Sequence, residues 1–351
     1  MPALSLSDRR NLADRIRARR ADVSIAVSDD YFIAHPEWHA RFGDAGKERC
    51  REDACFHIDF LAGAIEAGSD GPFRDYARWT ARMLNARKIP PECLRENFAS
   101  LRTNLARGLP ADEAALVDSI VDAGANAVED PRAMAVADDF NADILAARPL
   151  FLRAILHGER KAATGIALES LSAAKRVLEV YVGVFQEALY EVGRLWESNQ
   201  ITVAEEHMAT AVTQYVISQA YTHIPVSKAR RGKLVMTGVS GELHQVGAHM
   251  VSDVLEAEGY DVRFLGTNLP HSGIVAAVSE HKADVVGISV TMLFNIPQAI
   301  RLVADLRASL GDRMPRIVVG GAAFRSAPEL ARELGAEGVG VDLRAARTLL
   351  C

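Results

Sequence analysis

Two patterns of hydrophobic and polar positions alternate in the last third of the chain. Short apolar runs bounded by Gly or Pro, typical of strands buried on both faces, are separated by stretches with apolar residues at helical spacing. We expect strands near residues 233–239, 262–265, 284–289, 315–319 and 338–340. We expect helices near residues 245–258, 271–281, 296–310, 326–334 and 342–350. These repeated strand–helix units predict a doubly wound parallel sheet with the strand order 2-1-3-4-5.

The preceding segment, residues 148–226, carries helical periodicity and no alternating strand pattern. Between residues 171 and 196 the apolar positions at helical spacing are Val177, Leu178, Tyr181, Val182, Phe185, Leu189, Val192 and Leu195. Thr202 and Glu205 stand at the spacing of a capping box and predict that another helix begins there. With helices over 149–157 and 161–168, we expect a four-helix bundle over residues 147–228.

The first part of the chain, residues 1–125, predicts a separate helical domain. Helices are expected near residues 7–29, 47–67, 73–88, 91–107 and 111–124, with stops at Gly68, Gly71, Pro90, Pro91 and Pro110. Residues 126–146 predict a linker. The expected fold class is therefore α and α/β multidomain: a helical N-terminal domain, a four-helix-bundle cap, and a flavodoxin-like doubly wound parallel sheet over residues 230–351.

Composition narrows the setting in which the protein works. The chain has 351 residues, 49% hydrophobic residues and a net charge of −6, which favours a globular protein and argues against a nucleic-acid surface. No apolar run is long enough to span a membrane, and the arginine-rich N-terminus does not read as a signal peptide. Cys50, Cys55, Cys93 and Cys351 show no paired framework, so we expect a cytoplasmic protein.

Candidate binding residues follow three of the expected strands. The strand order makes the first, third and fourth strands neighbours, and the carboxyl ends of parallel strands are where such folds bind ligands. His244 follows the first of these strands, Ser289 and Thr291 the next, and the pair Gly320–Gly321 the last. We expect them to line one slot with a hydroxyl on one wall and bare backbone on another. The alternative for Gly320–Gly321 is an ordinary tight turn between a strand and a helix.

The histidine loop has the chemistry of a metal ligand. Glu242, two residues before His244, can hold one ring nitrogen and free the other for a metal. Gly247 allows a bulky planar group to approach the backbone. The alternative is a loop histidine that is hydrogen-bonded to a neighbour. No dinucleotide motif G-x-G-x-x-G and no Walker A motif is present, which disfavours a dinucleotide or nucleoside triphosphate.

The segment Glu242-x-His244-x-x-Gly247 resembles the E/D-x-H-x-x-G motif of cobalamin-binding domains. The resemblance implies that His244 replaces the cofactor's own base as the lower axial ligand of cobalt. It also implies that Ser289, Thr291, Gly320 and Gly321 line the channel for the nucleotide tail. Thr291 departs from the family, which has leucine at the third position of its Ser-x-Leu element.

A second resemblance lies in the bundle. Trp196 and the pair Glu206–His207 resemble the W-x9-E-H cap of light-sensing adenosylcobalamin proteins. This resemblance implies that the three side chains lie over the upper corrin face and around the adenosyl group. Glu197 stands where the light-sensing repressors have a histidine that captures cobalt after photolysis, so the later upper ligand stays open between His207, water and another histidine. The alternative is a core tryptophan beside a solvated acidic helical turn.

Residues 35–39, 48–53, 57 and 76–79 combine arginine, histidine and aromatic side chains. Through them residues 1–125 loosely resemble the globin-like helical region of photocobilins, which hold biliverdin beside cobalamin. The resemblance implies a bilin site with arginines for the propionates and aromatic rings as walls. Its candidate residues are Arg49, Arg51, His57, Tyr76, Arg78 and Trp79. The alternative is a plain dimerisation or spacer domain.

Together these resemblances imply a light sensor and not an enzyme. Photolysis of bound adenosylcobalamin would change domain packing, oligomer state or partner binding, with biliverdin as a candidate second chromophore. The expected partners are a second copy of the chain or a regulatory protein, with no direct nucleic acid and no membrane. The alternative is a corrinoid methyl-carrier protein for a methyltransferase system. Such carriers typically show Asp-x-His-x-x-Gly-Lys, where this chain has Glu242 and Ala248 at the Asp and Lys positions.

Overall fold

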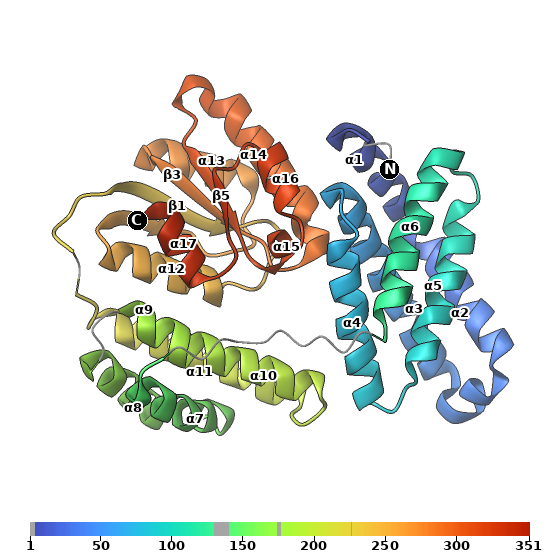
Figure 1. Cartoon of the computed structure of the whole chain (residues 1–351), viewed down its shortest axis with the longest axis horizontal. Coiled ribbons are helices and arrows are strands. Elements are labelled where there is room, and N and C mark those ends of the chain that lie inside the picture. The colour runs from blue at the N-terminus through green and yellow to red at the C-terminus, as the bar shows by residue number, and fades with distance from the viewer. Residues whose placement is uncertain (1–3, 130–139, 174–176, 226) are drawn as a thin grey trace. The chain divides into compact units, whose positions relative to one another are not determined.

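A computed structural model of the whole chain describes residues 4–129, 140–173, 177–225 and 227–351 (Figure 1). The chain divides into two compact units. The first comprises Met1–Arg132, Met292–Ile300 and Ser326–Glu333, and the second comprises Ala133–Thr291, Arg301–Arg325 and Leu334–Cys351. The bundle and most of the sheet region therefore belong to one unit, and the amino-terminal helices belong to the other.

The amino-terminal helices of the first unit are α1 (Leu6–Ala18), α2 (Arg20–Ala34), α3 (Pro36–Ala67), α4 (Gly71–Ala86), α5 (Pro91–Ala106) and α6 (Ala111–Ala127). Large apolar side chains from different helices, such as Leu61 of α3, Phe73 of α4 and Phe98 of α5, are fully buried between them. Gly68 ends α3 in the left-handed conformation, with φ of 67°, which glycine adopts at little cost.

Two sequence expectations for this unit were wrong. The helix expected over 7–29 is interrupted at Arg19, whose φ and ψ of −94° and 3° leave the helical region. The guanidinium of Arg19 donates to the carbonyls of Asn104 and Leu105, so tertiary contacts hold that break. Residues 30–46, for which no helix was expected between 7–29 and 47–67, complete α2 and begin α3, with a kink at Gly43 where φ is 60°.

The segment expected to be a linker, residues 126–146, overlaps the end of α6 and the start of α7 (Ala142–Leu156). Its residues 130–139 lie outside the described residues. Asn141 caps α7 by accepting a hydrogen bond from the Ile144 N–H at 2.9 Å. Pro149 therefore lies inside this helix and does not begin it, contrary to the expected 149–157. An upstream cap can override the start that a proline suggests, at the cost of one backbone hydrogen bond.

The described part of the second unit begins with a helical bundle. It consists of α7, α8 (Arg160–Ala173), a long interrupted helix and α11 (Val203–Tyr221). The interrupted helix contains α9 (Val177–Val180), a π-helix η1 (Tyr181–Gln186) and α10 (Glu187–Glu197). The capping box at the start of α11 is confirmed, because Thr202 Oγ1 accepts the Glu205 N–H at 3.2 Å and the Glu205 carboxylate accepts the Thr202 N–H at 2.7 Å.

The described strands form one parallel sheet in the predicted order β2-β1-β3-β4-β5. The strands are β1 (Gly232–Gly238), β2 (Tyr260–Phe264), β3 (Val285–Ser289), β4 (Arg316–Gly320) and β5 (Gly338–Gly340). The helices between and after them are α12 (Val246–Ala257), α13 (His271–His281), α14 (Ile296–Leu310), α15 (Ala322–Arg325), α16 (Pro328–Glu333) and α17 (Leu343–Leu350). The short helices η2 (Leu293–Asn295) and η3 (Gly311–Arg313) flank α14. The expected fold class is confirmed.

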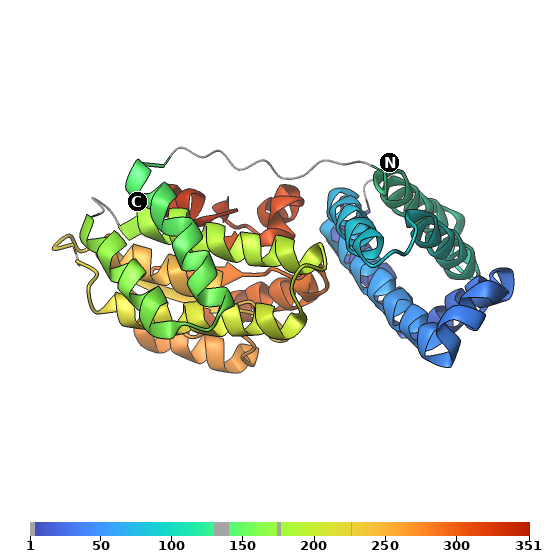
Figure 2. The ribbon, with the colours of Figure 1, turned by 90° about the horizontal axis from the view of Figure 1, so that it is seen from below.

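The bundle lies against the side of the sheet that carries α12 and α17 (Figures 1 and 2; Figure 2 shows it from below). Met250 and Val254 of α12 and Leu343 of α17 belong to the same buried cluster as the bundle residues Phe151 and Phe185. A shared apolar core therefore joins bundle and sheet. In the ranges that the structure describes, no helix combines the length and apolar composition that crossing a bilayer needs.

Candidate functional site

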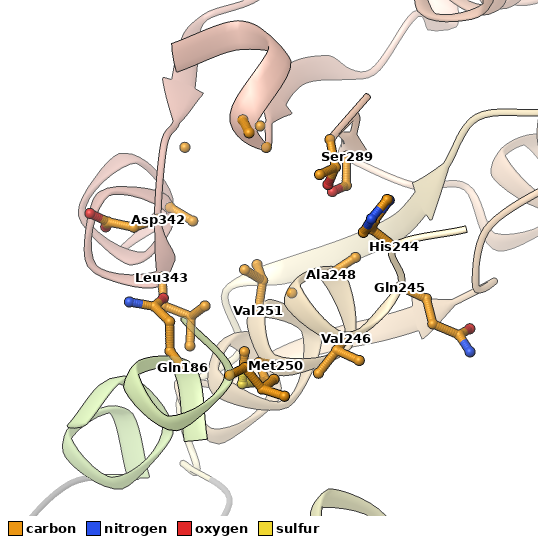
Figure 3. Close-up of a pocket in the computed structure, with 18 of the residues that line it drawn as sticks. Gln186, His244, Gln245, Val246, Ala248, Met250, Val251, Ser289, Asp342 and Leu343 are labelled. Carbon is orange, nitrogen blue, oxygen red and sulfur yellow. The ribbon is translucent and has the colours of Figure 1, made fainter. Parts of the chain in front are cut away.

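A cavity of about 790 Å³ opens inside the second unit, between the carboxyl edge of the sheet and the bundle. Figure 3 shows His244 beside Ser289 on one side of it, and Gln186, Asp342 and Leu343 on the other. The location is the one that the strand order predicted, because ligands of doubly wound sheets bind outside the carboxyl ends of the strands.

The sheet register brings three candidate loops to the same level. Gly238 pairs with Ser289, and Ser289 pairs with Gly320, so β1, β3 and β4 end side by side. Ser289, Thr291, Gly320 and Gly321 all line the cavity. Gly321 has φ of 92°, and a Cβ built there would lie 2.3 Å from the Val290 carbonyl oxygen. The turn therefore requires glycine at Gly321 whatever the cavity binds.

Glu242 and His244 form a tightly held pair at the end of β1. Glu242 is fully buried, and its Oε1 lies 2.6 Å from His244 Nδ1. Because a carboxylate only accepts, Nδ1 is the protonated nitrogen and the lone pair of the half-exposed ring is on Nε2. The second carboxylate oxygen accepts the Thr291 N–H at 2.9 Å, which ties the histidine loop to the end of β3. His244 lines the cavity, so its Nε2 can serve as a metal ligand there.

Gly247 lies in the first turn of α12 and lines the cavity. A Cβ built on Gly247 meets no protein atom within 4 Å. The missing side chain is therefore not demanded by protein packing, and it leaves open space directly over the backbone near His244. A planar macrocycle bound through His244 would need space of this kind.

The bundle wall contains two of the three residues expected over the corrin. Glu206 and His207, in α11, line the cavity, and their side chains pair at 2.6 Å between Glu206 Oε2 and His207 Nδ1. Trp196 lies near the end of α10, three residues beyond the cavity-lining Gly193, and is half-buried outside the lining set. The structure thus brings Glu206 and His207 to the site of His244 and leaves Trp196 one turn away.

Sequence reasoning missed several residues of this cavity. On the bundle side they are Gln186, Leu189, Tyr190, Gly193, Thr210, Ala211 and Gln214. On the sheet side they include Arg325, Val341, Asp342, Leu343 and Ala346. The spacing of His207, Thr210, Ala211 and Gln214 is that of one helical face and could have been found by extending the cap motif along α11. The residues after β5 carry no comparable signal.

The candidate bilin residues of the first unit have different surroundings. The Arg49 side chain is 82% exposed and pairs with Glu52, and Arg51 pairs with Glu48 on the same helix. His57 and Tyr76 are buried and joined by a hydrogen bond of 2.7 Å between Nδ1 and the hydroxyl. Burial lowers the pKa of His57 to about 3.

Arg78 and Trp79 of α4 complete the candidate bilin set. Arg78 pairs with Asp75, and the Trp79 ring lies 6.3 Å from the ring of Tyr76. The structure therefore gathers His57, Tyr76 and Trp79 and leaves Arg49 at the surface.

Comparison with known families identifies the class of the second unit. Residues 232–346 match the family described as B12 binding domain, and residues 150–221 match a second family of the same description. These two stretches contain the sheet and the bundle that enclose the cavity. This part of the chain is therefore a cobalamin-binding module. The residues present fit the cofactor, because His244 offers a free ring nitrogen and Gly247 leaves room above the backbone.

Among curated proteins the chain is similar to the HTH-type transcriptional repressor CarH of Myxococcus xanthus, with 29% identity over 159 residues, 45% of this chain and 52% of the repressor. It is similar to dimethylamine corrinoid protein 2 of Methanosarcina mazei, with 27% identity over 161 residues, 44% of this chain and 75% of that protein. The chain thus spans about half the length of the repressor that it matches.

A solved structure supports the fold. The monomethylamine corrinoid protein of Methanosarcina barkeri superimposes with a TM-score of 0.52 at 19% identity, over 59% of this chain and 98% of the other. At this identity the likeness concerns the fold alone.

Proposed function

We propose that the chain is an adenosylcobalamin-dependent light sensor with His244 as the lower cobalt ligand. The observation that carries the proposal is that the pair Glu206–His207, from a cap motif typical of light-sensing cobalamin proteins, lines the same cavity as His244, whose ring is held from behind by the buried Glu242. Similarity to the repressor CarH supports the same reading. Bound adenosylcobalamin would supply a cobalt–carbon bond that green light breaks.

The described residues have the chemistry to hold an adenosyl group. A ribose needs hydrogen-bond partners, and the bundle wall offers the Glu206 carboxylate and the Gln186 and Gln214 amides. The hydroxyl of Thr210 donates to Glu206 Oε1 at 3.0 Å and orients that carboxylate. Trp196, on the same helix as the wall residue Gly193, would shield the group from water.

The light signal would be transmitted by a change in the packing of the bundle against the sheet. Loss of the adenosyl group would remove contacts with the bundle residues, whereas His244 and the sheet would still hold the opposite face of the cofactor. A change in the contacts on the bundle side would shift the equilibrium between different packings of the bundle on the sheet. The oligomer state or the affinity for a regulatory partner would change with it. Such a protein senses and transmits, so we propose no catalysed reaction for it.

A second candidate is a corrinoid methyl carrier. It is favoured by the similarity to dimethylamine corrinoid proteins and by the corrinoid-protein fold. Ala248 argues against it, because the carriers that the motif resembles have lysine at this position. In the structure Ala248 is buried in α12 and lines the cavity.

The two candidates differ in the upper ligand that they prefer. For a sensor, adenosylcobalamin binds more tightly than methylcobalamin, and Trp196→Ala erodes that preference. The matched control is Trp38→Ala in the first unit, which leaves the preference unchanged. Titrations followed by absorbance measure both affinities. Equal affinity for the two forms, together with catalysed methyl transfer to a thiol, would establish the carrier instead.

A further inference from the structure

Two histidines line the cavity, and each is paired through Nδ1 with a carboxylate. On the sheet side Glu242 Oε1 lies 2.6 Å from His244 Nδ1. On the bundle side Glu206 Oε2 lies 2.6 Å from His207 Nδ1. Both histidines line the cavity, and within its described lining they are the only histidines.

The shared geometry has a chemical consequence. Each carboxylate accepts the Nδ1–H, which fixes the tautomer and places the lone pair on Nε2. A carboxylate behind an imidazole also orients its ring for a metal.

The bundle-side pair is anchored and has room to act. Glu206 accepts from Thr210 Oγ1 at 3.0 Å, one turn further along α11, so the carboxylate is fixed to its helix. The His207 side chain is 74% exposed, so protein atoms do not enclose the ring. Glu197, at the position of the histidine in light-sensing repressors, is half-buried outside the lining set, and carboxylate is a poorer ligand than imidazole for this metal.

We infer that His207 Nε2 becomes the upper axial cobalt ligand when the cobalamin that binds carries water, and not an alkyl group, on its upper face, because the imidazole then displaces that water. This inference rests on the proposed cobalamin site and assigns its second protein ligand. In the step, the Nε2 lone pair forms a bond to cobalt(III) as the cobalt–water bond breaks, and the water leaves as a neutral molecule. No electron and no proton is transferred, so the step needs no further reactant.

The probe is aquacobalamin, added to the full chain in the dark. We compare the wild type with His207→Ala, Glu206→Gln and the control His223→Ala, which removes an exposed histidine of the same unit whose Nδ1 lies 3.0 Å from Thr222 Oγ1. Absorbance reports the axial ligands, and added azide reports how readily the upper ligand is replaced. Thermal melting of each variant checks folding.

In the wild type and in His223→Ala, the bound cobalamin is expected to show the absorbance spectrum of cobalt with a nitrogen ligand on each face of the corrin. Azide is expected to replace the upper ligand slowly. In His207→Ala the bound cobalamin is expected to show the spectrum of a water ligand, and azide is expected to replace that ligand faster than in the wild type by about tenfold or more. The azide rate of Glu206→Gln is expected to lie between these two, because this variant removes only a contact that supports the ligand. A water-type spectrum in the wild type, with azide rates equal to those of His207→Ala, overturns the inference alone. Failure of the wild type to bind aquacobalamin overturns the proposed function as well.

Discussion

At the scale of single residues, Glu242 organises the candidate cobalt site. One carboxylate oxygen accepts the N–H groups of Leu243 and His244 and pairs with His244 Nδ1, while the other accepts the Thr291 N–H. A buried carboxylate satisfied in this way fixes the loop backbone as well as the ring. We therefore expect Glu242 to affect both cobalamin affinity and the stability of the loop.

The first prediction concerns the lower ligand. His244→Ala is expected to weaken cobalamin binding strongly and to shift the bound spectrum toward the base-off form. Glu242→Ala leaves the ring in place but unsupported, and is expected to cost about 10- to 100-fold in affinity. It also leaves buried N–H groups without an acceptor, so its melting temperature falls. An unchanged base-on-like spectrum in His244→Ala would contradict the assignment.

The second prediction concerns Gly247. Alanine in place of glycine stabilises helices by up to about 1 kcal/mol, and nothing lies within 4 Å of the added Cβ. Gly247→Ala is therefore expected to hold or raise the free energy of unfolding while lowering cobalamin affinity, because the methyl group enters the cavity. Denaturant unfolding and cobalamin titration measure the two quantities.

The matched control for Gly247→Ala is Gly165→Ala. Gly165 lies in α8, its added Cβ also meets nothing within 4 Å, and it is not among the residues lining the cavity. This change is expected to raise stability and leave affinity alone. Equal cobalamin affinity in both variants would mean that the space over Gly247 is not part of the site.

The cavity residues that the sequence predicted lie in short motifs, whereas the cavity residues that it missed do not form a short motif. Glu242, His244 and Gly247 lie within one strand-to-helix loop, so a short motif and one strand position were enough to group them. Gln186 and Tyr190 reach the cavity from a helix that contains a π-helical turn. A π-helical turn has i→i+5 hydrogen bonds, so the residues after it point to a different side of the helix than a regular 3.6-residue period predicts.

At the scale of secondary structure elements, the π-helix η1 joins the bundle to α12. The buried Tyr181 hydroxyl, from the start of η1, donates to Asp253 Oδ2 of α12 at 2.8 Å. His249, one turn before Asp253, lies 3.6 Å from its other oxygen and stacks on Phe264. Because α12 also contributes Gly247 and Val251 to the cavity wall, this contact sets how the bundle sits over the site.

The third prediction follows from the burial of Asp253, which raises its pKa from 3.8 to about 7. Between these values the folded chain keeps a proton that the unfolded chain has released. The free energy of unfolding contributed by Asp253 therefore falls as pH rises through this window, by about 1.4 kcal/mol per unit of pKa shift at most, and is constant above it. Asp253→Asn keeps an acceptor for Tyr181 and should abolish this dependence.

The measurement for Asp253 is denaturant unfolding at several pH values from 4 to 8. Burial lowers the pKa of His249, so His249 contributes stability that rises with pH toward its ordinary value of 6.5 and opposes the Asp253 effect. Wild type and Asp253→Asn are compared in a His249→Gln background, because His249 lies 3.6 Å from Asp253 and its contribution would not cancel by subtraction. A difference that does not change with pH would contradict the account of this contact.

Secondary structure was predictable from sequence where local signals agreed with the fold. The buried strands, α13 and α14 were expected within a few residues of their observed bounds, because apolar runs and helix-stop residues mark them. The break at Arg19 and the early start of α7 were not expected. Arg19 is held by carbonyls from a distant helix, and the cap Asn141 competes with the more visible proline signal of Pro149.

At the scale of the whole molecule, the fourth prediction concerns the first unit. If it holds a bilin, the full chain mixed with biliverdin is expected to absorb in the red as well as in the green. His57→Ala should shift or weaken the red band, because His57 and Tyr76 are the buried polar pair of the candidate set. The matched control Arg102→Ala removes a surface arginine outside the candidate set, which pairs with Asp122.

A biliverdin titration followed by absorbance decides whether the first unit binds a bilin. A free-pigment spectrum at saturating protein would mean that the first unit serves only as a dimerisation or docking module. Cobalamin binding by the second unit is expected to be unaffected by either variant, since every residue lining the cavity belongs to that unit.

The most direct test of the central claim is the elution volume of adenosylcobalamin-loaded protein before and after green light, recorded together with its absorbance. Photolysis is expected to change both the spectrum and the elution volume, and methylcobalamin-loaded protein or protein kept in the dark serves as the control. If the spectrum shows complete photolysis while the elution volume and the affinity for any regulatory partner stay unchanged, the chain binds cobalamin but does not sense light through it.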